Sequence, residues 1–322
     1  MTPIFHFRRP KTPFEDPFLF VRILRERRAV QFDLGDVGCL APSELFRITD
    51  VFVTHMHIDH FIGFDALLRV VLRRETPLNI YGPPNMAACV AGKLRGYDWN
   101  LIRDYPLEIN VFSFNGRDIL HSVFRAKNRF RRETAGRTAS DGTLLAGPLF
   151  RVKASKLSHG TPCLAYALEE GSHINIDKDR LLRKGLEVGP WLTDFKKMVR
   201  ENAPADSRIR ILGRTRRLKE LSDIAAITKG QKISYASDIA MTPKNMAALT
   251  ELAEGSDIFF CEAYYLEKDR ELARQRFHLT AKACGAIARR AGVKKLIVTH
   301  VSPKYSDSPG QVVAEAMDEF RS

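Results

Sequence analysis

The feature that most constrains this chain is a cluster of three histidines and one aspartate directly after an apolar stretch. The cluster reads HMHIDH and contains His55, His57, Asp59 and His60, and the preceding residues, ITDVFVT, predict a buried strand. Imidazole nitrogen and carboxylate oxygen are good ligands for Zn²⁺. Four such ligands within six residues cannot all reach one tetrahedral ion in a relaxed geometry. The spacing therefore favours a pair of ions, with His55 and His57 on one and Asp59 and His60 on the other.

Three more candidate ligands stand at the ends of other predicted strands. His159 follows RVKASKLS, Asp238 ends KISYASD, and His300 ends KKLIVTH. Together with the cluster they make seven ligands, and each ion receives four protein contacts if Asp238 bridges the two. His278, just before a predicted helix, is a candidate general acid or base rather than a ligand. The remaining histidines lie in charged or irregular stretches and are not expected to be ligands: His6, His121 and His173.

Strand-like and helix-like segments alternate along the whole chain. A hairpin is predicted at 18–34 with RERR as its turn, helices at 64–74 and 280–292, and a final helix from Gly310. The stretch 178–220 is predicted to be a helical, basic excursion. With no internal repeat and no low-complexity linker, the pattern indicates one α/β domain over 1–322 that carries insertions.

Composition excludes several classes of protein. Of the 322 residues, 44% are hydrophobic and 28% are charged, which is ordinary globular usage. No apolar run approaches 18 residues, and the N-terminal residues lack the apolar core of a secretory signal, so no membrane association is expected. The five cysteines form no CxxC pair, which favours a reducing, cytoplasmic location over a disulfide framework.

The net charge of +13 is concentrated in three segments. Residues 1–28, 121–137 and 178–220 carry +4, +5 and +7, and the rest of the chain is close to neutral. Such segments could neutralise nucleic-acid phosphates. The alternative is a solvated surface that only keeps the protein dissolved, and charge alone does not separate the two.

At this point the motifs resemble a known family. HMHIDHFIGFDALL, with PLNIYGPP after it, resembles the second motif of metallo-β-lactamase-fold hydrolases, and its continuation is most similar to ribonuclease Z. QFDLGD, with Asp33 and Gly35, resembles the first motif, LSHGTPCLAYAL the third and YASDIAMTP the fourth. The closest stretch runs from CEAYYLEKD to VTHVSPKY and contains His278 and His300. The resemblance implies a four-layer αββα sandwich.

The resemblance also implies a chemistry. Two Zn²⁺ ions per subunit, at ligands that also accept Mn²⁺ or Fe²⁺, would hold a bridging hydroxide that attacks phosphorus. Asp59 would orient the nucleophile as well as bind metal, and His278 would donate a proton to the leaving 3′ oxygen. Glu262 is a candidate to orient a histidine, and a purely structural strand-end role is the alternative. Asp33 is expected to support the site rather than bind metal.

The implied substrate is precursor tRNA or another RNA, from which the 3′ trailer is removed. LLRKGLEVGPWLTDFKK lies where the family places a protruding arm that grips tRNA. Gly189 and Pro190 would match the Gly-Pro element of that arm, with Lys184, Lys196 and Lys197 around it as substrate-binding residues. The resemblance further implies a homodimer, in which the arm of one subunit serves the active site of the other.

Two departures from the family keep other functions open. The N-terminal FHFRRPKTPFEDPFLF lacks the family's Gly-rich loop, and GDVGCL stands where the first motif continues into Gly-Thr-Gln. These favour, as the alternative, a hydrolase of the same fold acting on another phosphodiester or an ester. A third reading is a non-catalytic RNA-binding protein with a structural metal. Seven ligands argue against it, because a structural zinc needs only four.

Overall fold

The structure, a computed structural model, describes residues 4–24 and 26–322. Arg25, in the predicted RERR turn, lies outside the described residues. The chain divides into two compact units: one runs to Glu169 and resumes at Gln231, and the other spans Glu170–Gly230. They are called the main unit and the inserted unit below.

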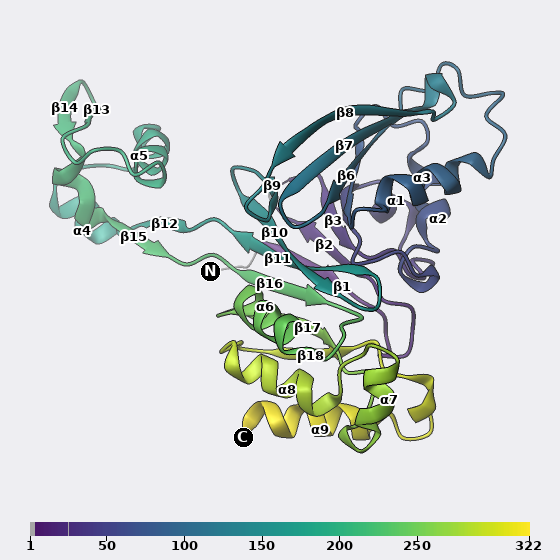
Figure 1. The fold of residues 1–322 in the computed structure, drawn as a ribbon. Coiled ribbons are helices and arrows are strands. Elements are labelled where there is room, and N and C mark those ends of the chain that lie inside the picture. Colours follow the sequence, from purple (N-terminus) through teal and green to yellow (C-terminus); the bar gives the residue numbers. More distant parts are fainter. Residues whose placement is uncertain (1–3, 25) are drawn as a thin grey trace. The chain divides into compact units, whose positions relative to one another are not determined.

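The main unit contains two sheets (Figure 1). The first has eight strands in sequential order: β1 (Phe5–Arg8), β2 (Leu19–Ile23), β3 (Ala29–Phe32), β4 (Ile48–Phe52), β5 (Leu78–Gly82), β6 (Glu108–Phe114), β7 (Asp118–Arg125) and β8 (Arg132–Ala139). The second has six, in the order β18 (Leu296–Thr299), β17 (Ile258–Glu262), β16 (Lys232–Ala236), β11 (Pro162–Glu170), β10 (Phe150–Ser158) and β9 (Thr143–Ala146).

Aromatic side chains fill the space between the two sheets. Phe32 and Phe52 of the first sheet pack against Tyr166 of the second, with ring centroids 5.8 and 5.5 Å from it. The same buried cluster includes Tyr81, Tyr235 and Phe260. Burial of such rings dominates the energetics of a core of this kind, because each removes a large apolar area from water.

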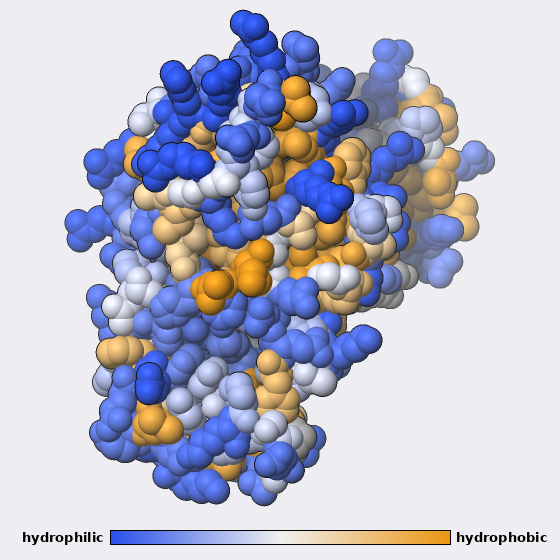
Figure 2. All heavy atoms as spheres, turned by 90° about the vertical axis from the view of Figure 1, so that its right-hand side faces the viewer, coloured by the Kyte–Doolittle hydropathy of each residue, from blue (hydrophilic) through white to orange (hydrophobic). Residues whose placement is uncertain are grey.

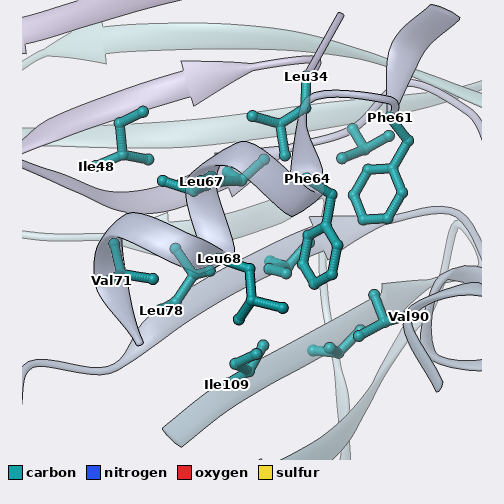
Figure 3. Close-up of a cluster of buried hydrophobic side chains, with 14 of the residues drawn as sticks. Leu34, Ile48, Phe61, Phe64, Leu67, Leu68, Val71, Leu78, Val90 and Ile109 are labelled. Carbon is teal, nitrogen blue, oxygen red and sulfur yellow. The ribbon is translucent and has the colours of Figure 1, made fainter. Parts of the chain in front are cut away.

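Helices cover the outer face of each sheet. The first sheet is covered by α1 (Pro42–Leu45), α2 (Phe64–Val71) and α3 (Met86–Arg95), and the second by α6 (Pro243–Ala253), α8 (Ala281–Arg290) and α9 (Pro309–Arg321), with the short α7 (Arg270–Gln275) nearby. On the first face Phe64, Leu67 and Leu68 of α2 pack onto Ile48, Leu78 and Ile109 of the strands (Figure 3). The layers are therefore helix, sheet, sheet, helix, as the αββα prediction requires.

Most sequence predictions of elements are confirmed. The 18–34 hairpin is β2 paired antiparallel with β3, and the strand before the histidine cluster is β4. The helices at 64–74, 280–292 and from Gly310 are α2, α8 and α9. The basic segment 121–137 forms most of the β7–β8 hairpin at the sheet edge, where exposed charges discourage pairing with another chain.

The prediction that 178–220 is helical is wrong for its second half. The inserted unit begins with β12 (His173–Ile176), α4 (Lys178–Arg183) and α5 (Trp191–Arg200), but β13 (Arg208–Ile211) and β14 (Arg214–Arg217) then form an antiparallel hairpin. Leu212 and Gly213, both with positive φ, make its two-residue turn. The alternation RIRI buries the two isoleucines and exposes the arginines, a period of two that outweighs helix propensity. The unit closes with the 3₁₀ helix η3 (Leu218–Ile224) and with β15 (Ala225–Thr228), which pairs with β12.

The surface of the molecule is largely polar. Figure 2 shows one face that is mostly hydrophilic, with hydrophobic side chains gathered near its centre. Among the described residues no helix combines the length and the apolar character needed to cross a bilayer.

Candidate metal centre

The candidate site is built at the ends of strands that the two sheets bring together. The HMHIDH cluster follows β4, with Ile58–His60 in one 3₁₀ turn. His159 follows β10, Asp238 follows β16 and His300 follows β18. Since β16, β17 and β18 are parallel, their carboxyl ends share one edge of the second sheet. Asp238 and His300 both have positive φ, an uncommon backbone conformation for residues other than glycine.

The structure gathers the seven predicted ligands into two groups that share one carboxylate. One group is His55, His57, His159 and Asp238, and the other is Asp59, His60, Asp238 and His300, with the ligand atoms of each group within 4.8 Å of one another. Asp238 Oδ2 lies 3.4 Å from Nε2 of His55 and 3.5 Å from Nε2 of His60 and of His159. Asp238 Oδ1 lies 2.9 Å from Nε2 of His300.

Two buried nitrogen atoms show that this donor set suits cations. Nε2 of His55 and Nε2 of His60 are buried and have no hydrogen-bond partner. Buried polar atoms are normally satisfied, so an orphan pair facing the same carboxylate needs a partner of another kind. Divalent cations fit, because imidazole and carboxylate are their ligands and the ligand atoms of each group lie within 4.8 Å of one another. The site is suited to binding divalent metal.

Charge and burial keep His55 and the two aspartates in the form that binds metal. Burial lowers the pKa of His55 to about 4, so its imidazole is neutral at neutral pH. Burial alone would also lower the pKa of His60 and of His300, but the neighbouring carboxylates, Asp238 above all for His300, raise both. Burial would raise the pKa of Asp59, but His60 and His300 lower it to about 2. The pKa of Asp238 is likewise held well below its usual range against burial, chiefly by His300 and His60. Both aspartates are therefore carboxylates over the physiological range.

A second layer of residues fixes the orientation of the histidines. Asp33 accepts from His60 Nδ1 at 2.9 Å, from the Tyr235 hydroxyl at 2.9 Å, and from the backbone N–H and hydroxyl of Thr54. The carbonyl of Phe277 lies 2.7 Å from Nδ1 of His159. In both cases Nδ1 is occupied, which leaves Nε2 to face the site.

His278 lies beside the two groups without belonging to either. Its Nδ1 is 2.8 Å from Oε2 of Glu262, and the Tyr264 ring stacks on it with centroids 3.9 Å apart. Glu262 is itself buried at the end of β17 and accepts from the backbone N–H of Ile239. Burial lowers the pKa of His278 to about 4. A neutral imidazole is therefore held with one nitrogen free toward a pocket of about 550 Å³ that His57, Asp59 and His300 also line.

Sequence reasoning missed several residues of this pocket. Tyr264, Arg276 and Lys304 line it, and Thr54 and Tyr235 support it through Asp33. Thr54 directly precedes the candidate ligand His55, and Tyr264 lies two residues after Glu262. Their closeness in sequence to these candidate residues was an available signal. No sequence signal marked Arg276 and Lys304, because their position at the pocket depends on how the loops fold. His121 and His173, expected not to be ligands, bind Asn110 and Glu170 instead.

Comparison with known proteins decides the family. No protein-family model matches the chain. Ribonuclease Z of Deinococcus radiodurans is 30% identical over 271 residues, which cover 83% of this chain and 80% of that protein. The chain belongs to the ribonuclease Z family. Among solved structures, the short form of human tRNase Z has a TM-score of 0.53 at 16% identity, with 93% of each chain covered.

The fold of this ribonuclease Z family member agrees with a second solved structure. The metallo-β-lactamase-fold protein YhfI of Bacillus subtilis has a TM-score of 0.52 at 14% identity, covering 97% of this chain and 88% of that one. At such identities the likeness speaks for the fold alone. The αββα sandwich predicted from the sequence is the metallo-β-lactamase fold.

In this family member the inserted unit has its own small core. Leu181, Trp191, Phe195 and Ile209 are buried within it. Of the predicted substrate-binding residues, Gly189 and Pro190 precede α5, Lys197 is exposed, Lys196 is half-buried, and Lys184 forms an ion pair with Asp223 at 3.1 Å. Arginines that the sequence analysis did not single out lie exposed on the β13–β14 hairpin: Arg208, Arg210, Arg214 and Arg217.

Proposed function

We propose that this protein is a zinc-dependent endoribonuclease that removes 3′ trailers from precursor tRNA. The observation that carries the proposal is the pair of ligand groups sharing Asp238, in a chain of the ribonuclease Z family. Seven ligands around one bridging carboxylate suit two ions, and nitrogen-rich groups with three and two histidines suit Zn²⁺. Mn²⁺ and Fe²⁺ are the competing occupants that a metal analysis would distinguish.

The roles of the site residues follow from their positions. When bound, divalent ions at such a site lower the pKa of water and neutralise charge on the phosphate. His55, His57, His159, His60 and His300 would hold them together with the two aspartates. Asp59, with an exposed side-chain fraction of 32%, is the ligand carboxylate most open to the pocket and can accept a proton from the nucleophile.

His278 is the proposed general acid. Burial raises the pKa of Glu262 well above its usual range, so a protonated Glu262 can donate to Nδ1 and leave the proton of the neutral imidazole on Nε2, which can deliver it to the leaving 3′ oxygen. The stacked Tyr264 ring limits rotation of the imidazole, which keeps that nitrogen in one direction. Glu262 acts through His278 and is a positioning residue.

The decisive test is incubation with a precursor tRNA that carries a 3′ trailer, with the cut site mapped at nucleotide resolution. We expect a single cut at the end of the mature tRNA, lost in His57→Ala. Hydrolysis of a small phosphodiester without any cut in the precursor would favour the alternative, a hydrolase with another substrate. A metal-loaded protein that binds tRNA and cuts nothing would favour the RNA-binding reading.

We propose that the inserted unit is the tRNA-gripping arm. Phosphate contacts supply most of the affinity for a folded RNA, and the unit offers exposed arginines on β13–β14. Because β12 and β15 pair antiparallel, a two-residue turn can replace residues 174–227. The shortened protein should lose precursor cleavage and keep hydrolysis of a small phosphodiester. Equal cleavage of the precursor by both forms would contradict this role.

The family resemblance supports a homodimer in which the arm acts on the partner's site, and the free thiols support a cytoplasmic location. Mixing the arm-deleted protein with His57→Ala tests the first point. Neither variant should cleave the precursor alone, and activity should return in the mixture if the arm works across subunits. No recovery, with dimers verified by light scattering, would place arm and site in the same chain.

A further inference from the structure

A second cavity of about 610 Å³ lies in the main unit, apart from the metal pocket. Three segments distant in sequence form it: the β6–β7 turn, the end of β10 and the start of α6. Its lining residues are Asn115, Gly116, Arg117, Lys156, Leu157, Ser158, Lys244 and Asn245. None of them is acidic, and none lines the metal pocket.

The cavity gathers three cations that form no ion pair with any described carboxylate, although Arg117 lies close enough to Asp118 to help Arg137 lower the pKa of that carboxyl. Arg117, Lys156 and Lys244 are exposed, and within the described residues none of them forms an ion pair. The nearest acid in sequence, Asp118, is bound to Arg137 at 2.7 Å. Three unpaired positive charges around one concavity repel each other, so they raise the local potential without stabilising the fold.

The charge of Lys244 is also placed where it does not stabilise the fold. It occupies the first turn of α6, where the helix dipole disfavours a positive charge, and that turn contains no acidic residue. Gly116 brings the opposite wall close, with a φ of +99° and a position where a Cβ would lie 3.0 Å from the Lys156 side chain. A side chain there would be strained at this φ and would press against the Lys156 side chain.

Hydrogen bonds connect the cavity to the metal centre. Asn245, which is 4% exposed, donates to the carbonyls of Ser158 and Ala240, both at 2.8 Å. The Ala240 N–H also donates to Ser158 at 2.9 Å, which joins the chain just before His159 to the chain just after Asp238. Lys156 precedes His159 by three residues of extended chain, about 10 Å at ~3.3 Å per residue.

We propose that this cavity binds a backbone phosphate of the RNA within a few nucleotides of the bond cleaved at the metal centre. The inference rests on the proposed function and adds a contact that is independent of the arm. Lysine and arginine are the usual phosphate donors, and RNA is held by such contacts to its backbone. A phosphate here would hold the strand on one side of the metal centre and so add binding energy that the bound substrate and the transition state share.

The test compares the full chain with a triple variant, Arg117→Ala, Lys156→Ala and Lys244→Ala. Affinity for a fluorescent precursor tRNA is measured by anisotropy over a range of salt concentrations, and cleavage kinetics are measured in parallel. We expect roughly tenfold weaker binding and a KM raised to match, the loss typical of one charge-assisted contact. The slope of log affinity against log salt should fall by about 1, with kcat unchanged.

A matched control removes the same charge elsewhere. The control variant carries Lys282→Ala, Lys295→Ala and Arg321→Ala. The three residues are exposed and lie, in that order, on α8, just before β18 and on α9. Wild-type affinity and salt slope in the cavity variant, or an equal loss in the control, overturns the proposal. So does a cavity variant that loses inorganic phosphate binding yet keeps its affinity for RNA. The cut made by the wild-type protein tests the proposed function separately.

Discussion

The substitution Asp33→Asn tests how the protein sets the ring orientation of a metal-binding histidine. Asp33 is fully buried and accepts hydrogen bonds from His60, Thr54 and Tyr235. As a carboxylate it can only accept, so Nδ1 of His60 carries the proton and Nε2 keeps its lone pair toward Asp238. An amide at this position donates from its nitrogen. When that nitrogen faces His60, the proton moves to Nε2, which can then no longer bind metal.

The size of the effect can be worked out in two ways. Changing a residue that orients a metal ligand typically costs 10–100-fold in metal affinity. A hydrogen bond to a charged group is worth about 1.5–3 kcal/mol, which converts to roughly 10–150-fold at 1.4 kcal/mol per tenfold. The two estimates agree, so we expect metal affinity to fall by about one to two orders of magnitude.

The assay is competition for Zn²⁺ against a chromophoric chelator, with circular dichroism as a check on folding. Asp36→Asn is the matched control, because Asp36 is exposed and, within the part of the chain that the structure describes, accepts only from the Gly38 backbone N–H. It should leave metal affinity unchanged. A folded Asp33→Asn protein that binds two ions as tightly as the wild type would refute the reasoning about His60.

Three further predictions concern the candidate site and the core of the main unit. His57→Ala should lose bound metal and activity together, whereas His278→Ala should keep its metal, measured by mass spectrometry, and lose most of kcat; metal loss in His278→Ala would contradict its role. Arg74→Ala should lower the free energy of unfolding, measured by urea titration, by about 2–4 kcal/mol. The buried guanidinium donates to four backbone carbonyls, including those of Phe46 and Ile48, and these carbonyls would lose their partner. A change under about 0.5 kcal/mol, the ordinary range of surface substitutions, would contradict this prediction. In the metal-free protein, His55 and His278 have pKa values of about 4 when folded against 6.5 when unfolded, so the unfolded chain binds these protons first and both histidines lower the stability as pH drops from about 6.5 to 4. The raised pKa of buried Glu262 acts in the opposite direction, because the folded protein binds that proton first. His278→Gln should flatten that slope, and an unchanged slope would argue against a buried neutral imidazole.

The gathering of the candidate metal ligands could be predicted from the sequence, because they are histidines and aspartates at the ends of predicted strands. His55 to His60 lie within one short segment, and His159, Asp238 and His300 each end a recognisable strand. The sharing of Asp238 followed from counting ligands. Its geometry needed the structure, since it depends on two sheets meeting at one edge.

The parts that could not be predicted are those set by contacts between distant segments. The support of His159 by the Phe277 carbonyl joins residues 118 positions apart, and no residue-type signal marks a backbone carbonyl. The β13–β14 hairpin was missed because a basic, helix-compatible composition masked its period of two. The cavity around Lys156 joins three segments whose charges look ordinary one at a time.

The pairing of β12 with β15 has a consequence for how the chain folds. Residues 170–230 interrupt what would otherwise be a simple hairpin, because β11 and β16 are antiparallel neighbours with Tyr166 opposite Tyr235. Closing a loop costs about 0.6 kcal/mol per doubling of its length, so an unstructured insertion of this size would cost ~2 kcal/mol more than a tight turn. An insertion that folds first removes that penalty, since its two ends already lie together. Formation of the second sheet then becomes, in kinetic terms, a local event.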